Sequence, residues 1–557
     1  MAYDLVVRNG TIVDGTGKAG YRADLAVHAG RITEIGRIAD TAREVIDADG
    51  LIVSPGFVDP HTHYDAQICW DSRLTCSPEH GVTSLVIGNC GVGIAPCRPG
   101  QRDAAIRDLV SVEGMSHDVL TRGIGWDWES FPDYMRAAGR RGTAVNLGFL
   151  APLTPFRSYV MGEDATTRAA TDDEAVRIAA LLEGAISAGA LGISTTRFRQ
   201  HIGYNGRPLA CRLASREEWS LYCRTLKRLG RGVIEIALSQ NPGILSDDER
   251  DMLEFLADES GRPITWSSMF PMGNDLDSCE RTLARSESLL ARRVLPQTLC
   301  IICPLEFSLL DPFVFAARPE WKPVFHRSPA EQIAIYADPS FRDAFRQGLG
   351  TPDVFFAADW SYLTPVESAN PALADRLGRS IAEIAGVDGL DPVDVFLDLA
   401  IADNLSTRFE ISQDHLEAQL RGLVGDPRTL LGLGDAGAHV DMFCGASYAT
   451  HLLGTWVRER QALTLEHAVK RLTSEPADFL GLSERGRLAP GKAADLAIFD
   501  PATVGDARRA KPVRDLPGGG LRLVVEAKGM EWVIVNGTVL LEQGRYRDGL
   551  PGQLLRS

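Results

Sequence analysis

The sequence predicts an α/β protein built on a parallel sheet, with a small β-rich region contributed by both chain ends. Amphipathic helices alternate with short apolar strands in the middle of the chain, and both ends carry strand–turn–strand patterns. At 557 residues the chain exceeds one small domain, although a barrel of about 250 residues or more can be a single unit. No apolar run approaches the about 20 residues that span a bilayer.

Both chain ends are predicted to form short strands joined by tight turns. Residues 3–14 read YDLVVRNGTIVD and residues 523–546 read LVVEAKGMEWVIVNGTVLLEQGRY, each with an Asn-Gly pair, which is the strongest short hairpin signal. We therefore expect residues 1–55 and 480–557 to form one composite β-sandwich domain. The remaining residues, 56–479, then form the parallel-sheet domain.

The middle of the chain repeats a strand–helix unit. Residues 172–190, DDEAVRIAALLEGAISAGA, predict an amphipathic helix, and the capping boxes Ser215/Glu218 and Ser246/Glu249 predict two further helix starts. Such alternation favours a parallel sheet, either doubly wound or closed into a barrel. The chain has neither GxGxxG at a strand-to-helix turn nor GxxxxGK[ST], which argues against a nucleotide-binding version.

The rhythm breaks between about residues 270 and 355. A segment of this length without the strand–helix pattern predicts a lid or pocket subdomain. We expect FFAAD, residues 355–359, to be the seventh strand of the sheet. Several aromatic residues of the insertion either line an apolar pocket or fill the insertion's own core: Phe307, Phe313, Phe315, Trp321 and Phe325.

Composition narrows the classes of partner and compartment. The chain has 74 acidic and 58 basic residues, a net charge of −16, which argues against nucleic acid or an anionic membrane as the main partner. Its ten cysteines show no disulfide framework, and MAYDLVVRNG lacks the pattern of a secretion signal. We expect a cytoplasmic protein with reduced thiols, and a homo-oligomer remains open.

The strongest local signal for chemistry is the motif VDPHTHYD. The apolar run LIVSPGFVD predicts a strand that ends next to His61 and His63. Their i, i+2 spacing places both imidazoles on one face. Two such side chains can bind one metal ion. The alternative is a pair of polar loop histidines, although the chain holds only eleven histidines in all.

Two further strand ends carry candidate ligands. GVTSLVIGNCGVG ends a strand at Cys90, which is either a thiolate ligand or an ordinary buried thiol. TLLGLGDAGAHV ends a strand at Asp435, whose carboxylate either binds a metal and accepts a proton from water or caps a helix. His439 follows and orients Asp435 or a substrate, or is an ordinary loop residue.

Together VDPHTHYD, GNCGVGIAP, GDAGAHV and RGRLAPGKAADLAIFD resemble the amidohydrolase superfamily, in its D-aminoacylase-like (N-acyl-D-amino-acid deacylase) branch. The resemblance covers nearly the whole chain. It implies a (β/α)8 TIM barrel, one or two divalent ions with Zn²⁺ expected, and hydrolysis of the C–N bond of a small amide by metal-activated water. By the resemblance, His61, His63 and Cys90 are metal ligands. Asp435 is the last-strand aspartate that acts as general base and touches the metal.

The chain departs from this family pattern on two strands. The fifth and sixth strand segments read GVIEIALSQN and RPITWSSMF, and no histidine occurs between His201 and His326. The two histidines that complete the tightly bound zinc site in D-aminoacylases are therefore missing. Glu235 either substitutes as a ligand or is a salt-bridged structural group. The third strand has Pro152-Leu153 where relatives have a histidine.

Three interpretations fit this loss. One metal sits on His61, His63 and Asp435, with Cys90 nearby or bound. Alternatively His201 is an unusual fourth ligand, since STTRFRQHIGYNG resembles a loop in a D-aminoacylase-like subgroup that also lacks the two histidines. In the third interpretation, metal binding is lost or weak and the chain performs other chemistry.

Four residues are expected to contact substrate: Arg157 as the anchor for a carboxylate, Tyr204 as a hydrogen-bond donor, and His201 and His439. The leading hypothesis is a metal-dependent amidohydrolase. The alternatives are a lactone, carbamate, cyclic imide or C–C substrate at the same site, and a non-catalytic binding or scaffold protein.

Overall fold

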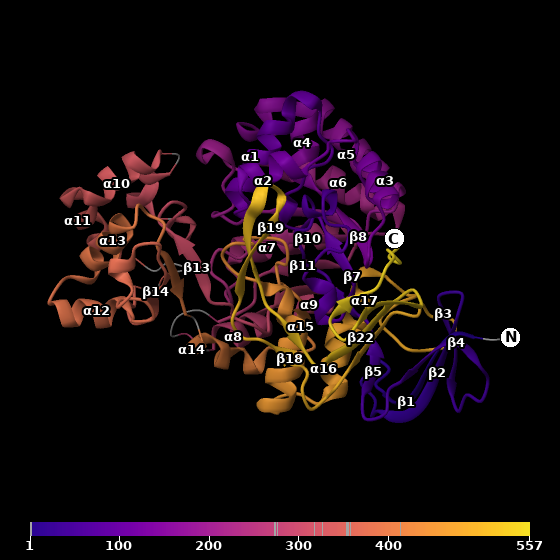
Figure 1. Ribbon diagram of the computed structural model, residues 1–557. Helices are drawn as coiled ribbons and strands as arrows, with labels where there is room; N and C mark the ends of the chain where they lie inside the picture. Colours follow the sequence, from indigo (N-terminus) through magenta and orange to yellow (C-terminus); the bar gives the residue numbers. More distant parts are fainter. Residues whose placement is uncertain are drawn as a thin grey trace.

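Two large sheets organise the protein (Figure 1). The computed structural model describes residues 3–271, 275, 277–316, 318–325, 327–351, 356, 358–412 and 414–556. Within these ranges one sheet has eight strands and another has nine. No helix in the described ranges combines the length and the apolar character needed to cross a bilayer.

The eight-stranded sheet is parallel, and its strands follow chain order. Its members are β6 (Phe57–Asp59), β7 (Val82–Ile87), β8 (Asn146–Pro152), β9 (Gly192–Thr196), β10 (Val233–Ala237), β11 (Ile264–Ser267), β12 (Val294–Thr298) and β16 (Leu430–Leu431). Just beyond its two edges a parallel bridge joins Thr62 to Ala436. The sheet is therefore curled, consistent with a TIM barrel, and its edges meet where the strands end.

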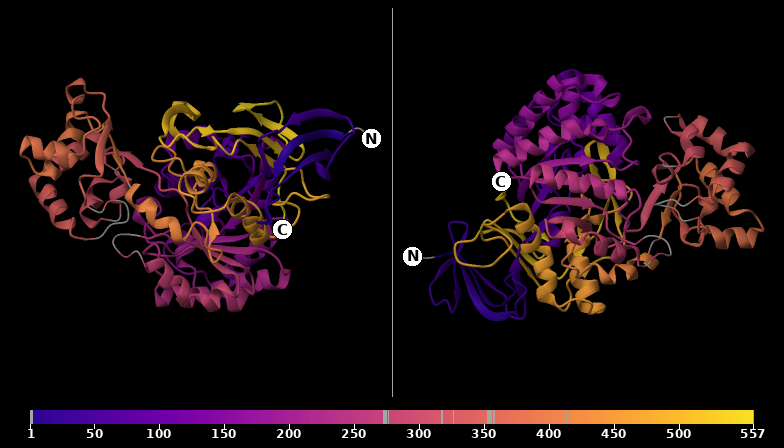
Figure 2. Two further views of the ribbon diagram at one scale, coloured as in Figure 1. Left: turned by 90° about the horizontal axis from the view of Figure 1, so that it is seen from below. Right: turned by 180° about the vertical axis from the view of Figure 1, so that it is seen from behind.

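Helices cover the outside of this sheet (Figure 2). Every residue of β7 and β8 is buried, as expected for strands with both faces covered. The predicted helix at 172–190 is α5 (Asp172–Ser187). Both predicted capping boxes are present, at the starts of α6 (Arg216–Leu229) and α7 (Asp247–Ser260).

The seventh strand of the parallel sheet is β12, not FFAAD. β12 lies between β11 and β16 in the sheet. Two residues of FFAAD, at positions 355 and 357, lie outside the described residues. The sequence of β12, VLPQT, holds a proline and a buried glutamine, so its strand pattern is weak.

The insertion forms a subdomain with its own sheet and core, seen as a separate lobe in Figure 1. Its sheet contains β13 (Leu305–Ser308), β15 (Arg408–Ile411) and β14 (Leu363–Glu367). The expected range of 270–355 is thus too early, because 294–298 belongs to the parallel sheet and 408–411 to the subdomain. Phe307, Phe315 and Trp321 lie in the core of the subdomain.

Four helices of the subdomain contribute to this aromatic core. They are α10 (Pro329–Ala337), α11 (Pro339–Gly348), α12 (Ile381–Asp388) and α13 (Pro392–Ala402).

Strands from both chain ends share the nine-stranded sheet. β5 (Ile52–Pro55) pairs antiparallel with β17 (Leu496–Phe499), which joins the N-terminal strands to the C-terminal ones. The Asn536-Gly537 pair is the predicted hairpin turn, between β22 (Met530–Val535) and β23 (Thr538–Glu542).

The first Asn-Gly pair is not a hairpin turn. Asn9 and Gly10 lie inside β1 (Tyr3–Ile12), where the register with β2 (Tyr21–His28) shifts. Asn9 has φ 61°, and its side chain donates to Asp47 Oδ1 at 2.9 Å. The pair therefore supplies the left-handed backbone of a β-bulge.

Candidate metal and active site

The four predicted metal-site residues meet at the carboxyl end of the parallel sheet. His61 and His63 follow β6, Cys90 follows β7, and Asp435 follows β16. His61 Nε2 lies 3.4 Å from Cys90 Sγ and 3.3 Å from Asp435 Oδ1, and His63 Nε2 lies 3.6 Å from the same oxygen. One donor atom each from His61, His63 and Cys90 all lie within 4.8 Å of one another.

Three of these separations are those expected between ligands of one divalent ion. Nitrogen, oxygen and sulfur donors bound at about 2.0–2.3 Å in a tetrahedron lie about 3.3–3.7 Å from each other. The observed 3.3, 3.4 and 3.6 Å agree with that spacing. A donor set of imidazole, thiolate and carboxylate suits zinc and similar divalent metals.

Small residues let the two edges of the sheet approach each other here. A Cβ on Gly437 would lie 2.8 Å from the backbone of His63, and its φ of +96° disfavours other residues. The His63 N–H donates to Ala436 O at 2.8 Å across the same junction. The motif GDAGAH therefore fixes Asp435 against the two histidines.

Buried polar groups orient three of these candidate ligands from behind. His61 Nδ1 lies 2.7 Å from Gln297 Oε1, so Nδ1 carries the hydrogen and Nε2 keeps its lone pair for the site. His63 Nδ1 lies 3.3 Å from Glu113 Oε1 at the end of α1 (Arg102–Glu113). The Cys90 N–H donates to Glu235 Oε2 at 2.7 Å.

Neither Gln297 nor Glu113 could be assigned from the sequence. Gln297 lies on the strand that sequence reasoning missed. Glu113 comes from a helix about which no motif gives any indication.

The electrostatics of the two histidines differ. Burial lowers the pKa of His61 to about 4. Burial also opposes charge on His63, but Glu113 and Asp435 outweigh it and raise the pKa of His63 to about 10. Burial likewise opposes charge on Asp435, yet His63 and His61 keep its pKa below the ordinary value. Metal ions and protons therefore compete for His63.

A cavity of about 260 Å³ opens over this centre. His61, Cys90 and Asp435 lie on its wall. Its other polar side chains are Gln200, His201, Ser239, Ser267, Ser268, Cys303 and His439. Most of the remaining wall is apolar: Val112, Phe198, Ala237, Pro242, Phe270, Leu299, Ile301, Ile302, Leu305, Phe313, Leu416, Leu433 and Phe443.

The fifth and sixth strands present small side chains to this cavity. Ala237 and Ser267 pair in register at the ends of β10 and β11, and both line it. Glu235, two residues earlier on β10, is on the same face of the strand. Its Oε1 is buried and has no hydrogen-bond partner among the described residues.

His201 lines the cavity, and within the described ranges a hydrogen-bond partner is found only for its Nδ1. Its Nδ1 lies 2.9 Å from Thr196 Oγ1, and that hydroxyl donates to Ala237 O at 3.3 Å. The hydroxyl proton is thereby used, so His201 Nδ1 is the donor and Nε2 holds the lone pair. Burial lowers the pKa of His201 to about 3.

His439 also lines the cavity. Its ring packs against Phe313 and Phe443, with centroids 4.7 and 5.7 Å away. Its backbone N–H donates to Glu113 O at 2.6 Å, which connects the loop after β16 to α1. Burial lowers the pKa of His439 to about 4.

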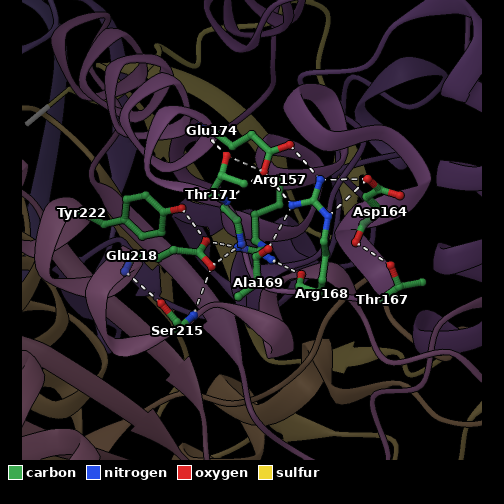
Figure 3. A network of polar contacts seen from close by, with 11 residues as sticks. Arg157, Asp164, Thr167, Arg168, Ala169, Thr171, Glu174, Ser215, Glu218 and Tyr222 are labelled. Atoms are coloured by element: carbon green, nitrogen blue, oxygen red, sulfur yellow. Dashed lines mark hydrogen bonds and ion pairs between the residues drawn. The ribbon is translucent and has the colours of Figure 1, made fainter.

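Arg157 is a structural residue, and the expectation that it anchors a substrate carboxylate is wrong. It is fully buried on α4 (Leu153–Met161) and pairs with Glu218 (Figure 3). Its Nε donates to Ala210 O at 2.8 Å and its Nη2 to Arg168 O at 3.0 Å. All three guanidinium nitrogens thus already have protein acceptors away from the cavity.

Tyr204 does not line the cavity either. Its backbone N–H donates to Asp108 Oδ1 at 2.9 Å, and the Arg107 guanidinium lies 4.7 Å from the centre of its ring. These contacts attach the loop after β9 to α1.

The curled parallel sheet, with two histidines, a thiol and a carboxylate converging at its carboxyl end, defines a metal-dependent hydrolase. The model of the Amidohydrolase family matches residues 44–298 and 357–540, and the chain belongs to this family. It acts on C–N amide bonds as a metal-dependent enzyme.

Relatives and solved structures support the D-aminoacylase-like branch. The chain is 28% identical to the D-aminoacylase of Alcaligenes xylosoxydans xylosoxydans, over 99% of this chain and 97% of that protein. It is 29% identical to an uncharacterised protein of Mycobacterium tuberculosis, over 100% and 95%. A crystal structure of D-aminoacylase superposes with a TM-score of 0.68 at 25% identity, over 100% of both chains. The N-acyl-D-glutamate deacylase of Bordetella bronchiseptica, complexed with zinc and a phosphonate inhibitor, gives 0.66 at 25%, also over 100% of both chains.

Proposed function

We propose that this enzyme hydrolyses small N-acyl compounds with a single divalent ion, Zn²⁺ in the first place, held by His61, His63 and Asp435 with Cys90 beside them. The observation that carries the proposal is the convergence of these four side chains. Three donor separations are 3.3–3.6 Å, and one donor atom each of His61, His63 and Cys90 lies within 4.8 Å of the others. The names of its relatives, D-aminoacylase and the N-acyl-D-aspartate and N-acyl-D-glutamate deacylases, support an N-acyl substrate.

Asp435 is the proton carrier in this proposal. The side chains of His61 and His63 are 0% and 6% exposed, whereas that of Asp435 is 33% exposed and lies on the cavity wall. When bound, the ion supplies Lewis acidity, which polarises a carbonyl and lowers the pKa of water toward about 7. Asp435 accepts the proton of the attacking water and delivers it to the leaving nitrogen.

The two cavity histidines position the substrate. His201 Nε2 has a lone pair and accepts a hydrogen bond from the amide N–H of the substrate. His439 forms part of the cavity wall beside the insertion, because Phe313 of the insertion packs against its ring.

The proposal extends to the domain organisation and the compartment of the protein. The parallel sheet and its helices act as a (β/α)8 barrel, and residues 1–55 with 480–557 form a β-sandwich domain beside it. All ten cysteines are free, in keeping with a cytoplasmic enzyme.

The test is metal-dependent turnover. Protein is stripped with a chelator, reloaded with zinc or manganese, and assayed for release of free amine from a panel of N-acyl compounds. We expect activity to vanish on stripping and to return on reloading, and Asp435→Asn to lose about 100-fold or more while retaining its fold. Turnover that survives stripping, or an Asp435→Asn variant of full activity, contradicts the proposal. If hydrolysis is confined to lactones or carbamates, the same site cleaves another type of bond.

A further inference from the structure

We propose that the substrate of this enzyme is an apolar amide whose amine portion lacks a carboxylate, and not an N-acyl amino acid. The inference rests on the proposed function and narrows its substrate class. It follows from the charge of the cavity wall.

No side chain that lines the cavity is Lys or Arg, as far as the described residues go. Residues outside the described ranges are Met, Ala, Gly, Asn, Leu, His, Pro, Asp, Val, Phe, Gln and Ser, so none of them adds a Lys or Arg. A substrate carboxylate in this cavity has no permanent cation of the protein to pair with.

Arg197 and Arg199, which flank Phe198 in the sequence, are exposed and do not line the cavity. Two further arginines near the cavity loops are used elsewhere. Arg157 is buried in its pair with Glu218. Arg212 directs Nη1 to the carbonyl oxygens of Arg199 and His201, at 3.3 and 3.1 Å. His201 and His439 are partly buried, and this burial lowers their pKa to about 3 and about 4, so both are neutral near pH 7.

The position of the substrate carboxylate makes the lack of a cation on the cavity wall decisive. In an N-acyl amino acid the carboxylate is attached to the carbon next to the scissile nitrogen, so it enters the cavity together with that bond. There it meets the carboxylate of Asp435 and the apolar wall. An ionised group buried without a partner is strongly disfavoured.

The wall instead suits an apolar amine portion. Phe198, Phe270, Phe313 and Phe443 line it, together with aliphatic side chains from the loop after β12. At about 260 Å³ the cavity lies near the small end of ligand pockets, about 300–1,000 Å³. We therefore infer an aryl-alkyl or alkyl N-acyl amine as the substrate class.

A matched set of probes tests the inference on the zinc-loaded enzyme. N-acetyl-2-phenylethylamine and N-acetyl-D-phenylalanine share one skeleton and differ by the carboxylate, and N-acetyl-D-phenylalaninol replaces it with a neutral group of similar size. We expect kcat/KM for the two neutral compounds to exceed that for the acid at least tenfold. An acid hydrolysed as well as the neutral compounds overturns the inference.

Binding separates this inference from the proposed function. Dissociation constants of the same probes are measured by calorimetry with the zinc-loaded protein. Tighter binding of the neutral probes without any hydrolysis supports the cavity chemistry and contradicts the proposed function. Equal or tighter binding of the acid, or no binding of any probe, overturns the inference.

An arginine introduced on the cavity wall gives a second test of the substrate class. Ile301 is partly exposed on the cavity wall. Ile301→Arg should lower the neutral-to-acid ratio of kcat/KM at least tenfold, because it supplies the missing counter-charge. Ile301→Met controls for length without charge and should leave that ratio within twofold. An unchanged ratio in Ile301→Arg, with its fold retained, counts against the inference.

Discussion

His63 Nδ1 lies 3.3 Å from Glu113 Oε1, and both side chains are buried. A carboxylate behind a metal-binding histidine fixes the ring and strengthens its lone pair. We expect Glu113→Ala to weaken zinc binding about 10–100-fold, and Glu113→Gln, which keeps the hydrogen bond, to weaken it less. Competition with a zinc-chelating dye measures the affinity.

The control for this prediction is on the same helix. Asp103 is exposed at the start of α1 and pairs with Arg107 at 2.7 Å. Asp103→Ala should leave zinc affinity unchanged, and circular dichroism should show both variants folded. Equal zinc affinity in Glu113→Ala and the native protein would remove the role assigned to Glu113.

The number of bound ions is the second prediction. The fifth and sixth strands carry no histidine, and Ala237 and Ser267 line the cavity at their ends, so we expect one zinc per chain by elemental analysis. The double substitution Ala237→His/Ser267→His adds two imidazoles at one level of the sheet and should raise the content toward two. Two ions per chain in the native protein would contradict the single-metal site.

Arg157 carries a prediction about stability. Removing one partner of a buried ion pair costs about 3–5 kcal/mol, because the other charge is left alone. Arg157→Met should therefore destabilise the protein by about that amount in urea unfolding, since Glu218 is buried too. Replacing both partners, as in Arg157→Met/Glu218→Leu, should restore much of the loss.

Arg168, in the same network, provides the comparison. Its side chain is 39% exposed and pairs with Asp164 and Glu174 (Figure 3). Arg168→Met should cost about 1 kcal/mol or less. If Arg157→Met instead keeps full stability and loses affinity for acidic substrates only, the structural role given to Arg157 is wrong.

The sequence predicted the parts of the site that depend on residues close together in the chain. His61 and His63 share a strand end, and their spacing alone places both rings on one face. The residues that orient them could not be predicted, because contact between β6 and a helix end fifty residues later depends on how the chain closes the sheet. Glu113 therefore emerged only from the fold.

The errors have similar causes. β12 was missed since Pro296 and Gln297 break its apolar pattern, yet Gln297 faces inward to hold His61. A lone arginine in a sequence gives no sign of its burial, so Arg157 is expected to anchor a substrate carboxylate. Its partner Glu218 is recognisable from the sequence only as the third residue of a helix cap.

His201 carries the last prediction. If its Nε2 accepts the substrate N–H, His201→Leu should raise KM about tenfold, since one buried hydrogen bond contributes about 1–1.5 kcal/mol. Thr196→Val removes the hydrogen bond that holds the His201 ring and should raise KM by less than tenfold. Thr196→Ser keeps the hydroxyl and should leave KM unchanged.

The pH dependence of KM distinguishes this role from an ordinary histidine. A histidine whose pKa is lowered stays neutral at every pH well above that value. Burial lowers the pKa of His201 to about 3, so its acceptor is present throughout the range from pH 8 down to pH 5. We therefore expect no rise in KM attributable to His201 over this range, measured as the difference between the native enzyme and His201→Leu. An exposed imidazole would protonate near its ordinary pKa of about 6.5 and lose the acceptor as the pH falls. A difference between native enzyme and variant that disappears below pH 6 would show that His201 titrates there and is not held neutral.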